Sequence, residues 1–159
     1  MKRVDFEIAK KIIKNPSKIA IAVTKDENEK KINLITLEWF MRTSINPPMF
    51  AISVGHRRYS YSCLQKFRYF NLCFPSVEMK QTALIAGTTS GRNVNKLDLI
   101  SESFFSGKLA KLPVFENAVA NFECEIFSQI RSGDHTIFIG KVKYSWIGEN
   151  QNLLLGTEL

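Results

Sequence analysis

The sequence has few of the residues that metal centres and disulfide frameworks require. Its only histidines are His56 and His135, and its three cysteines, Cys63, Cys73 and Cys124, are widely spaced and form no Cys-x-x-Cys pair. So few histidines exclude a histidine-rich metal centre, and the cysteine spacing predicts neither a zinc site nor a disulfide framework. We therefore interpret the cysteines as packing residues, and Cys124 as part of the core rather than as a nucleophile.

The sequence also lacks a long apolar run. The residues after Met1 carry mixed charges, and no stretch approaches the roughly 18 apolar residues that cross a bilayer. We expect a cytoplasmic protein with no membrane partner. A P-loop nucleotidase is not predicted, because no Gly-Lys-Ser or Gly-Lys-Thr is present, and there is no dinucleotide fingerprint either.

The chain carries a positive charge without a basic tract. It has 22 Lys and Arg against 15 Asp and Glu, a net charge of +7, which favours anionic partners such as phosphorylated cofactors or nucleic acid. The lysines are scattered, and no run of five or six basic residues forms a nucleic-acid arm. The length of 159 residues and the hydrophobic fraction of 45% predict one domain spanning residues 1–159.

The residue pattern predicts a mainly β protein with short helices. Apolar spacing indicates helices over residues 5–14, 59–67, 77–86 and 96–103, and strands over residues 19–24, 32–36, 49–54, 69–74, 120–126 and 135–146. Strand 120–126 alternates apolar and polar residues, which is typical of a half-buried strand. Mostly antiparallel hairpins favour a closed or partly closed β-barrel, which hides strand edges, over a doubly wound parallel sheet.

Residues 87–96, Gly-Thr-Thr-Ser-Gly-Arg-Asn-Val-Asn-Lys, have the composition of an anion cradle. Gly87 and Gly91 can adopt positive φ and expose backbone N–H groups, while Arg92 and Lys96 add positive charge. The hydroxyls of the intervening residues, Ser90 among them, can donate hydrogen bonds to a phosphate. The alternative is an ordinary polar turn with a solvated Lys96.

A second group lies in the predicted strand 32–36 and just after it. Asn33 offers an amide, Thr36 a hydroxyl, and Trp39 a flat apolar face with an N–H edge. This set suits a planar heteroaromatic ligand. The alternative is a strand with one polar face followed by a core tryptophan.

A third group begins the predicted helix 59–67. If Ser60 lies in the first helical turn, its hydroxyl and the N–H groups there form an anion site that Arg57 and Arg58 reinforce. The alternative is an N-capping serine with solvated arginines. The mixture of arginine and tyrosine could also stack on RNA bases, so a small basic RNA-binding barrel is a further alternative.

A fourth group opens the last long strand, where Asp134 precedes His135. A neutral histidine can hydrogen-bond a ligand carbonyl, a protonated one can balance an anion, and Asp134 can orient the ring. The alternative is a structural histidine in a turn.

The order of these motifs resembles the flavin reductase-like FMN-binding proteins, in particular the flavoredoxin group. The resemblance runs from about residue 19 to residue 146 and rests on Asn-x-x-Thr-x-x-Trp, Pro-Pro before a strand, Arg-x-Ser, Ser-Gly-Arg-x-x-x-Lys and Gly-Asp-His. It implies an FMN-binding split β-barrel, normally a homodimer, with one FMN per subunit at or near the interface.

The resemblance also implies roles for individual residues. The phosphate contacts fall on Thr36, Ser60, Ser90, Arg92 and Lys96, with Gly91 between two of them, and the isoalloxazine contacts fall on Asn33, Trp39 and His135. It implies an oxidoreductase that moves electrons from NAD(P)H through FMN to a redox partner protein or free flavin, without a dedicated acid or base. The alternative with the same site is a non-catalytic FMN-binding electron carrier.

Overall fold

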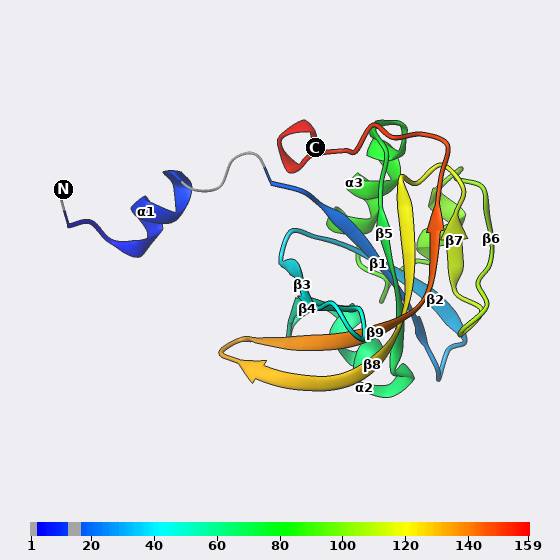
Figure 1. Cartoon of the computed structure of the whole chain (residues 1–159), viewed down its shortest axis with the longest axis horizontal. Helices are drawn as coiled ribbons and strands as arrows, with labels where there is room; N and C mark the ends of the chain where they lie inside the picture. The colour runs from blue at the N-terminus through cyan, green and yellow to red at the C-terminus, as the bar shows by residue number, and fades with distance from the viewer. Residues whose placement is uncertain (1–2, 13–16) are drawn as a thin grey trace.

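The computed structural model describes residues 3–12 and 17–159 and shows a strongly curled antiparallel sheet (Figure 1). The strand order is β2-β1-β5-β8-β9-β4-β3, and a separate sheet pairs β6 with β7. The strands are β1 Ala20–Asp26, β2 Lys31–Leu37, β3 Phe40–Ser44, β4 Met49–Gly55, β5 Tyr69–Phe74, β6 Phe104–Ser106, β7 Pro113–Phe115, β8 Ala120–Ser132 and β9 His135–Ile147. The α-helices are α1 Phe6–Ile12, α2 Tyr59–Phe67 and α3 Lys80–Thr88, with 3₁₀ turns η1 Val77–Met79, η2 Lys96–Leu99 and η3 Gly156–Glu158.

The connection between β2 and β3 shows why the sheet closes into a barrel. These strands occupy opposite ends of the strand order, yet only Glu38 and Trp39 lie between them in the chain. Three peptide steps span about 11 Å at most, so the two sheet edges must approach each other. The amide of Ser53 in β4 donates to the carbonyl of Trp39 at 2.9 Å and holds this seam. The predicted split β-barrel is confirmed.

Strand β1 is buried on both faces. Ile21 and Val23 belong to an apolar cluster that includes Ala83 of α3, whereas Ala22 on the opposite face belongs to a cluster that includes Leu64 of α2. The two helices therefore cover opposite faces of the sheet at this strand. This double burial is the physical reason for the continuous apolar run in the sequence.

Most predicted elements are confirmed, and some boundaries are wrong. Helix 59–67 and strands 69–74 and 135–146 match α2, β5 and β9 within one residue. Helix 5–14 corresponds to α1, and residues 13 and 14 lie outside the described residues. Helix 77–86 divides into η1 and α3, and helix 96–103 is only the four-residue turn η2. The sequence reading missed the short strands β3, β6 and β7.

The half-buried strand predicted at 120–126 is wrong in two respects. The strand continues to Ser132, and its polar residues Asn121 and Glu123 are both only 2% exposed. The segment that carries β6 and β7 covers this face and bonds to it. The Asn121 side-chain amide donates to the carbonyl of Phe115 at 3.0 Å, and a Glu123 carboxylate oxygen accepts the Leu109 amide at 2.7 Å. A satisfied polar layer thus replaces the expected solvent.

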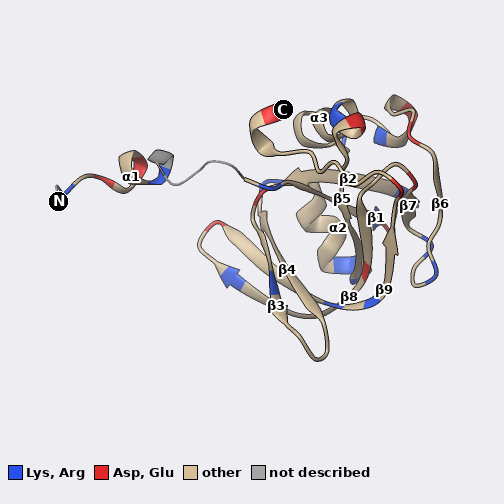
Figure 2. Cartoon of the chain, turned by 45° about the horizontal axis from the view of Figure 1, so that its top comes forward, with Lys and Arg blue, Asp and Glu red and all other residues tan. Residues whose placement is uncertain are grey.

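The three cysteines are buried, as predicted. Burial raises the pKa of the Cys63 thiol to about 11 and raises that of Cys73 and Cys124 as well, which keeps all three protonated. Among the residues that the structure describes, no helix is long and apolar enough to cross a membrane. Lys and Arg are distributed over many elements rather than collected along one (Figure 2).

Candidate functional site

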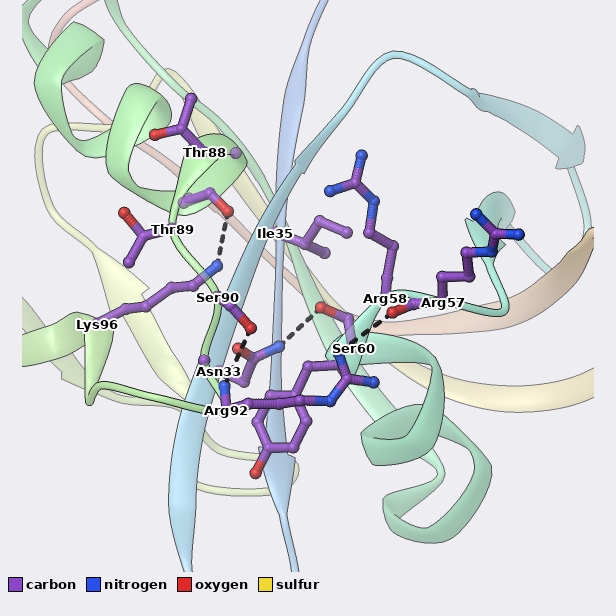
Figure 3. A pocket seen from close by; sticks show the side chains of 14 residues that line it. Asn33, Ile35, Arg57, Arg58, Ser60, Thr88, Thr89, Ser90, Arg92 and Lys96 are labelled. Atoms are coloured by element: carbon purple, nitrogen blue, oxygen red, sulfur yellow. Dashed lines mark hydrogen bonds between the residues drawn. The ribbon is translucent and has the colours of Figure 1, made fainter.

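A cavity of about 230 Å³ lies between β2, the start of α2 and the loop that follows α3 (Figure 3). Arg57, Arg58, Arg92 and Lys96 line it, and none of the described residues around it is a carboxylate. Figure 3 shows Lys96 reaching in from the loop while the two neighbouring arginines rise from the start of α2. This lining is suited to an anion with more than one negative charge.

Lys96 is buried rather than solvated, so the solvated alternative is wrong. The residue is only 3% exposed, and its Nζ donates to the carbonyls of Leu34 at 2.6 Å and Ala86 at 2.7 Å. An ammonium has three donors, so one remains beyond these two carbonyls. Burial, followed by the positive charge of Arg58, lowers the Lys96 pKa from 10.5 to about 8. An anion in the cavity would relieve that repulsion.

Ser60 and Asn33 form the floor of this cavity. Ser60 lies in the first turn of α2, as predicted, and is 3% exposed. The N-cap residue of α2 is Arg58, so the alternative of an N-capping Ser60 is wrong. The Asn33 side-chain amide donates to Ser60 Oγ at 2.7 Å. Asn33 Oδ1 is buried and has no partner among the described residues. A buried acceptor without a partner costs about 1–3 kcal/mol, which a donor group on a ligand would recover.

The glycines of the loop are needed for close approach and not for positive φ. Gly87 lies within α3, and Gly133 is the only glycine with a positive φ in the part of the chain that the structure describes. A Cβ on Gly91 would lie 2.2 Å from Asn33 Oδ1 and 2.8 Å from Tyr59 Cδ1. Gly87 and Gly91 therefore do not use the positive φ that glycine permits. Only a residue without a side chain lets the loop pack on β2 and α2 here.

Arg92 ties the loop to the start of α2. Its guanidinium donates to the carbonyl of Arg57 at 3.2 Å and lies 5.7 Å from the centre of the Tyr59 ring, while its amide donates to Ser90 Oγ at 3.3 Å. The Tyr59 hydroxyl in turn donates to Asp26. Tyr59 is thus engaged inside the protein, an arrangement that does not favour stacking on RNA bases.

A second cavity, of about 180 Å³, continues from the first along the seam between β2 and β4. The two share Ile35 and Arg58 in their linings. Trp39 lines the second cavity and is 61% exposed, so the core tryptophan alternative is wrong. Its ring centre lies 4.7 Å from that of His135 at an angle of 38°. Two aromatic faces beside a cationic cavity suit a planar ligand with an anionic tail.

Asp134 orients His135 within this second cavity. His135 Nδ1 and Asp134 Oδ1 are 2.6 Å apart, and this hydrogen bond lowers the pKa of the Asp134 carboxyl. The opposite side of the imidazole faces Gly55, where an added Cβ would lie 3.3 Å from Nε2. The sequence reading missed Gly55, although a glycine at the end of a predicted strand is a signal for close backbone approach.

The structure sorts the predicted site residues into two adjoining groups. Asn33, Ser60, Ser90, Gly91, Arg92 and Lys96 line the first cavity, and Thr36, Trp39 and His135 line the second. Asn33, assigned to the ring by the resemblance, lies in the cationic group. Thr36, assigned to the phosphate, donates its hydroxyl to the carbonyl of Ala83 in α3 at 2.6 Å.

Comparison with known proteins finds one family model, described as the flavin reductase like domain, which matches residues 13–157. An uncharacterized protein of Archaeoglobus fulgidus is 30% identical over 119 residues, 75% of this chain and 67% of that protein. The NADH-dependent FAD reductase of Streptomyces globisporus is 28% identical over 68% of this chain and 59% of its own. In four curated relatives the matched region spans 67%, 63%, 54% and 59% of the relative's length.

Two solved structures share the fold. The FMN-binding protein from Thermus thermophilus with bound p-hydroxybenzaldehyde has a TM-score of 0.76 and 29% identity, covering 86% of this chain and 74% of its own. Flavoredoxin from Methanosarcina acetivorans has a TM-score of 0.77 and 22% identity, covering 94% and 77% of the two chains. At its lower identity, the second structure supports the fold alone.

Proposed function

The chain belongs to the flavin reductase like domain family, and on that premise we propose that it is an oxidoreductase that binds FMN at the seam of its barrel. The observation that carries this proposal is the continuity of two cavities with different chemistry. The first is lined by four cations and by no carboxylate among the described residues, and the second presents Trp39 and His135. FMN has the matching parts, a phosphate at one end and a flat heteroaromatic ring at the other.

The residues present fit this cofactor at three points. Lys96, Arg92 and Ser60 would hold the phosphate through charge-assisted hydrogen bonds, which are about twice as strong as neutral ones. Trp39 and His135 would contact the ring. Asn33 Oδ1, buried without a partner among the described residues, is suited to accept from a hydroxyl of the chain that links ring and phosphate.

FMN, when bound, would supply the redox chemistry, because it can accept a hydride, that is one proton with two electrons, from a donor and pass the two electrons to an acceptor. The protein's own residues bind and orient it. The seam fixes Trp39 through its carbonyl, which accepts the Ser53 amide at 2.9 Å, and Asp134 fixes His135. This scheme requires no dedicated acid or base from the protein.

We further propose that a reduced nicotinamide nucleotide is the electron donor and that a partner protein or free flavin is the acceptor. Support comes from two relatives named as NADH-dependent flavin reductases, at 28% and 21% identity. The test is anaerobic mixing of FMN-loaded protein with NADH or NADPH in a stopped-flow instrument, followed by steady-state oxidation of the donor with added free flavin. A reductase bleaches the bound flavin on mixing and turns over.

The same experiment separates the proposal from the non-catalytic carrier. A carrier retains FMN and accepts electrons from a chemical reductant such as dithionite, but it shows no reduction by either nucleotide and no turnover. That result would contradict the enzymatic part of the proposal and leave FMN binding standing.

We also propose that the protein is a homodimer. Several large apolar side chains are exposed on β3, on the following turn and on β8: Met41 at 62%, Ile45 at 84%, Phe127 at 57% and Ile130 at 54%. Exposed apolar groups of this size are typical of association surfaces. Light scattering on the eluted chromatographic peak measures the molar mass directly, and a value of one chain would contradict this proposal.

A further inference from the structure

The second cavity, which presents Trp39 and His135 to the proposed flavin ring, is called the ring cavity below. A third cavity, of about 710 Å³, opens beside it at the end of the β8–β9 hairpin. It shares Gly55, Arg58 and His135 with the ring cavity, so a molecule bound here reaches the same imidazole that faces the proposed ring. Its volume lies within the range of about 300–1,000 Å³ that is usual for small-molecule and cofactor sites. A second substrate therefore has room next to the flavin.

The charge of this third cavity is strongly positive. Three guanidinium groups line it, from Arg57, Arg58 and Arg131. The only carboxylate among its described lining residues is Asp134, which is already bonded to His135 at 2.6 Å. None of the three arginines forms an ion pair with a described carboxylate. Their charges are available to a ligand.

Arg131 distinguishes this cavity from the cofactor site. Arg57 and Arg58 line both the first and the third cavity, whereas Arg131, near the end of β8, lines only the third. Four cations in the first cavity are sufficient for one phosphate, so the charge at Arg131 is not explained by FMN. His56 also lines the third cavity, and its ring is hydrogen-bonded to Thr136 Oγ1 at 3.0 Å.

We propose that the third cavity binds the phosphate-bearing end of the electron donor, and that the donor is the nicotinamide nucleotide with the additional ribose phosphate, NADPH. The proposal rests on the proposed function and adds the donor's chemical class. A guanidinium presents a planar fork of donors that matches a phosphate bidentately, and an arginine is the residue that accommodates a ribose 2′-phosphate in other nucleotide sites. Arg131 is the residue assigned to that phosphate.

The direct test is equilibrium binding of 2′,5′-ADP, which carries the ribose phosphate but no redox centre. Calorimetric titration compares wild-type protein with Arg131→Gln, both loaded with FMN and both free of it. We expect about tenfold weaker binding in Arg131→Gln, the loss of one charge-assisted interaction, and much weaker binding of 5′-AMP to the wild type. Arg42→Gln, an identical charge change on β3 outside all three cavities, should bind like the wild type.

Kinetics give a second readout. The rise in KM caused by Arg131→Gln should be about tenfold larger for NADPH than for 1-benzyl-1,4-dihydronicotinamide, a donor without phosphate, with kcat for NADPH little altered. Equal binding of 2′,5′-ADP by wild type and Arg131→Gln, or no binding by either, would overturn the proposal. Failure to retain FMN would instead refute the proposed function, and the titration of FMN-free protein would still report on Arg131.

Discussion

Replacement of Lys96 by methionine is the perturbation that most sharply separates a phosphate site from a polar turn. Lys96 is 3% exposed as a residue, and Lys96→Met keeps its aliphatic stem but removes the ammonium. That ammonium donates to the carbonyls of Leu34 and Ala86 and is close enough to Arg58 for the charge of Arg58 to lower its pKa. A hydrogen bond to a charged group contributes about 1.5–3 kcal/mol, which corresponds to about a tenfold to a hundredfold increase in the dissociation constant for FMN.

Riboflavin provides the internal reference for this prediction, since it has the ring and the ribityl chain but no phosphate. Quenching of flavin fluorescence measures both ligands on the same protein samples. We expect the loss caused by Lys96→Met to be at least tenfold larger for FMN than for riboflavin. Lys143→Met is the matched control, because Lys143 is exposed on β9, pairs with Glu125 at 3.0 Å and lines none of the three cavities.

Two results would refute this reasoning. Equal losses for FMN and riboflavin would mean that Lys96 supports the fold of the site and not the phosphate. Equal effects of Lys96→Met and Lys143→Met on FMN affinity would mean that residues 87–96 form only a turn.

The remaining predictions concern pH, the loop and the ring. Because the Lys96 pKa is lowered to about 8, the ammonium loses its proton above that pH. FMN affinity should therefore fall by up to tenfold per pH unit from pH 8 to 9 in the wild type but not in Lys96→Met. Calorimetry at each pH measures this affinity. In the unfolded chain the Lys96 ammonium keeps its proton up to about pH 10.5, whereas in the folded chain it loses that proton above about pH 8. The free energy of unfolding of FMN-free wild type should therefore increase with pH between 8 and 10.5, and that of Lys96→Met should lack this increase. Denaturant titration measures both. Gly91→Ala should lower stability by about 1–3 kcal/mol and abolish FMN uptake, because the new Cβ meets Asn33 Oδ1 at 2.2 Å; an unchanged melting curve would contradict this. Trp39→Ala removes an exposed ring, so it should weaken FMN and riboflavin equally and change the free energy of unfolding by less than about 0.5 kcal/mol in the same titration.

The strands of the barrel could be predicted from the sequence because the burial of each strand face sets the pattern of apolar residues along that strand. The uninterrupted apolar run of 19–24 follows directly from the burial of β1 on both faces. The burial of Glu123 has no local signal, because it depends on a segment some fifteen residues upstream that folds over β8. In the structure, Glu123 accepts from the amides of Lys108 and Leu109 and from Trp146 Nε1. The period-two pattern of the strand contains none of these partners, so on its own it predicts that Glu123 faces solvent.

The candidate site was predictable in composition but not in geometry. A cluster of hydroxyls, glycines and cations has the composition of an anion site, and the order of the motifs along the chain resembles that of a known family. Which contact each residue makes depends on the curl of the sheet. Asn33 points to Ser60 and to Gly91, far along the chain, and only that packing explains why the loop requires glycine at 91.

The central claim is that the seam of this barrel holds one FMN through the cavity lined by Lys96, Arg92 and Ser60. Its most direct test is the visible absorption spectrum of protein that has been incubated with excess FMN and then freed of unbound flavin by gel filtration. We predict a yellow protein with one flavin per chain, and much less retention when riboflavin replaces FMN. A colourless protein after the same treatment would contradict the account.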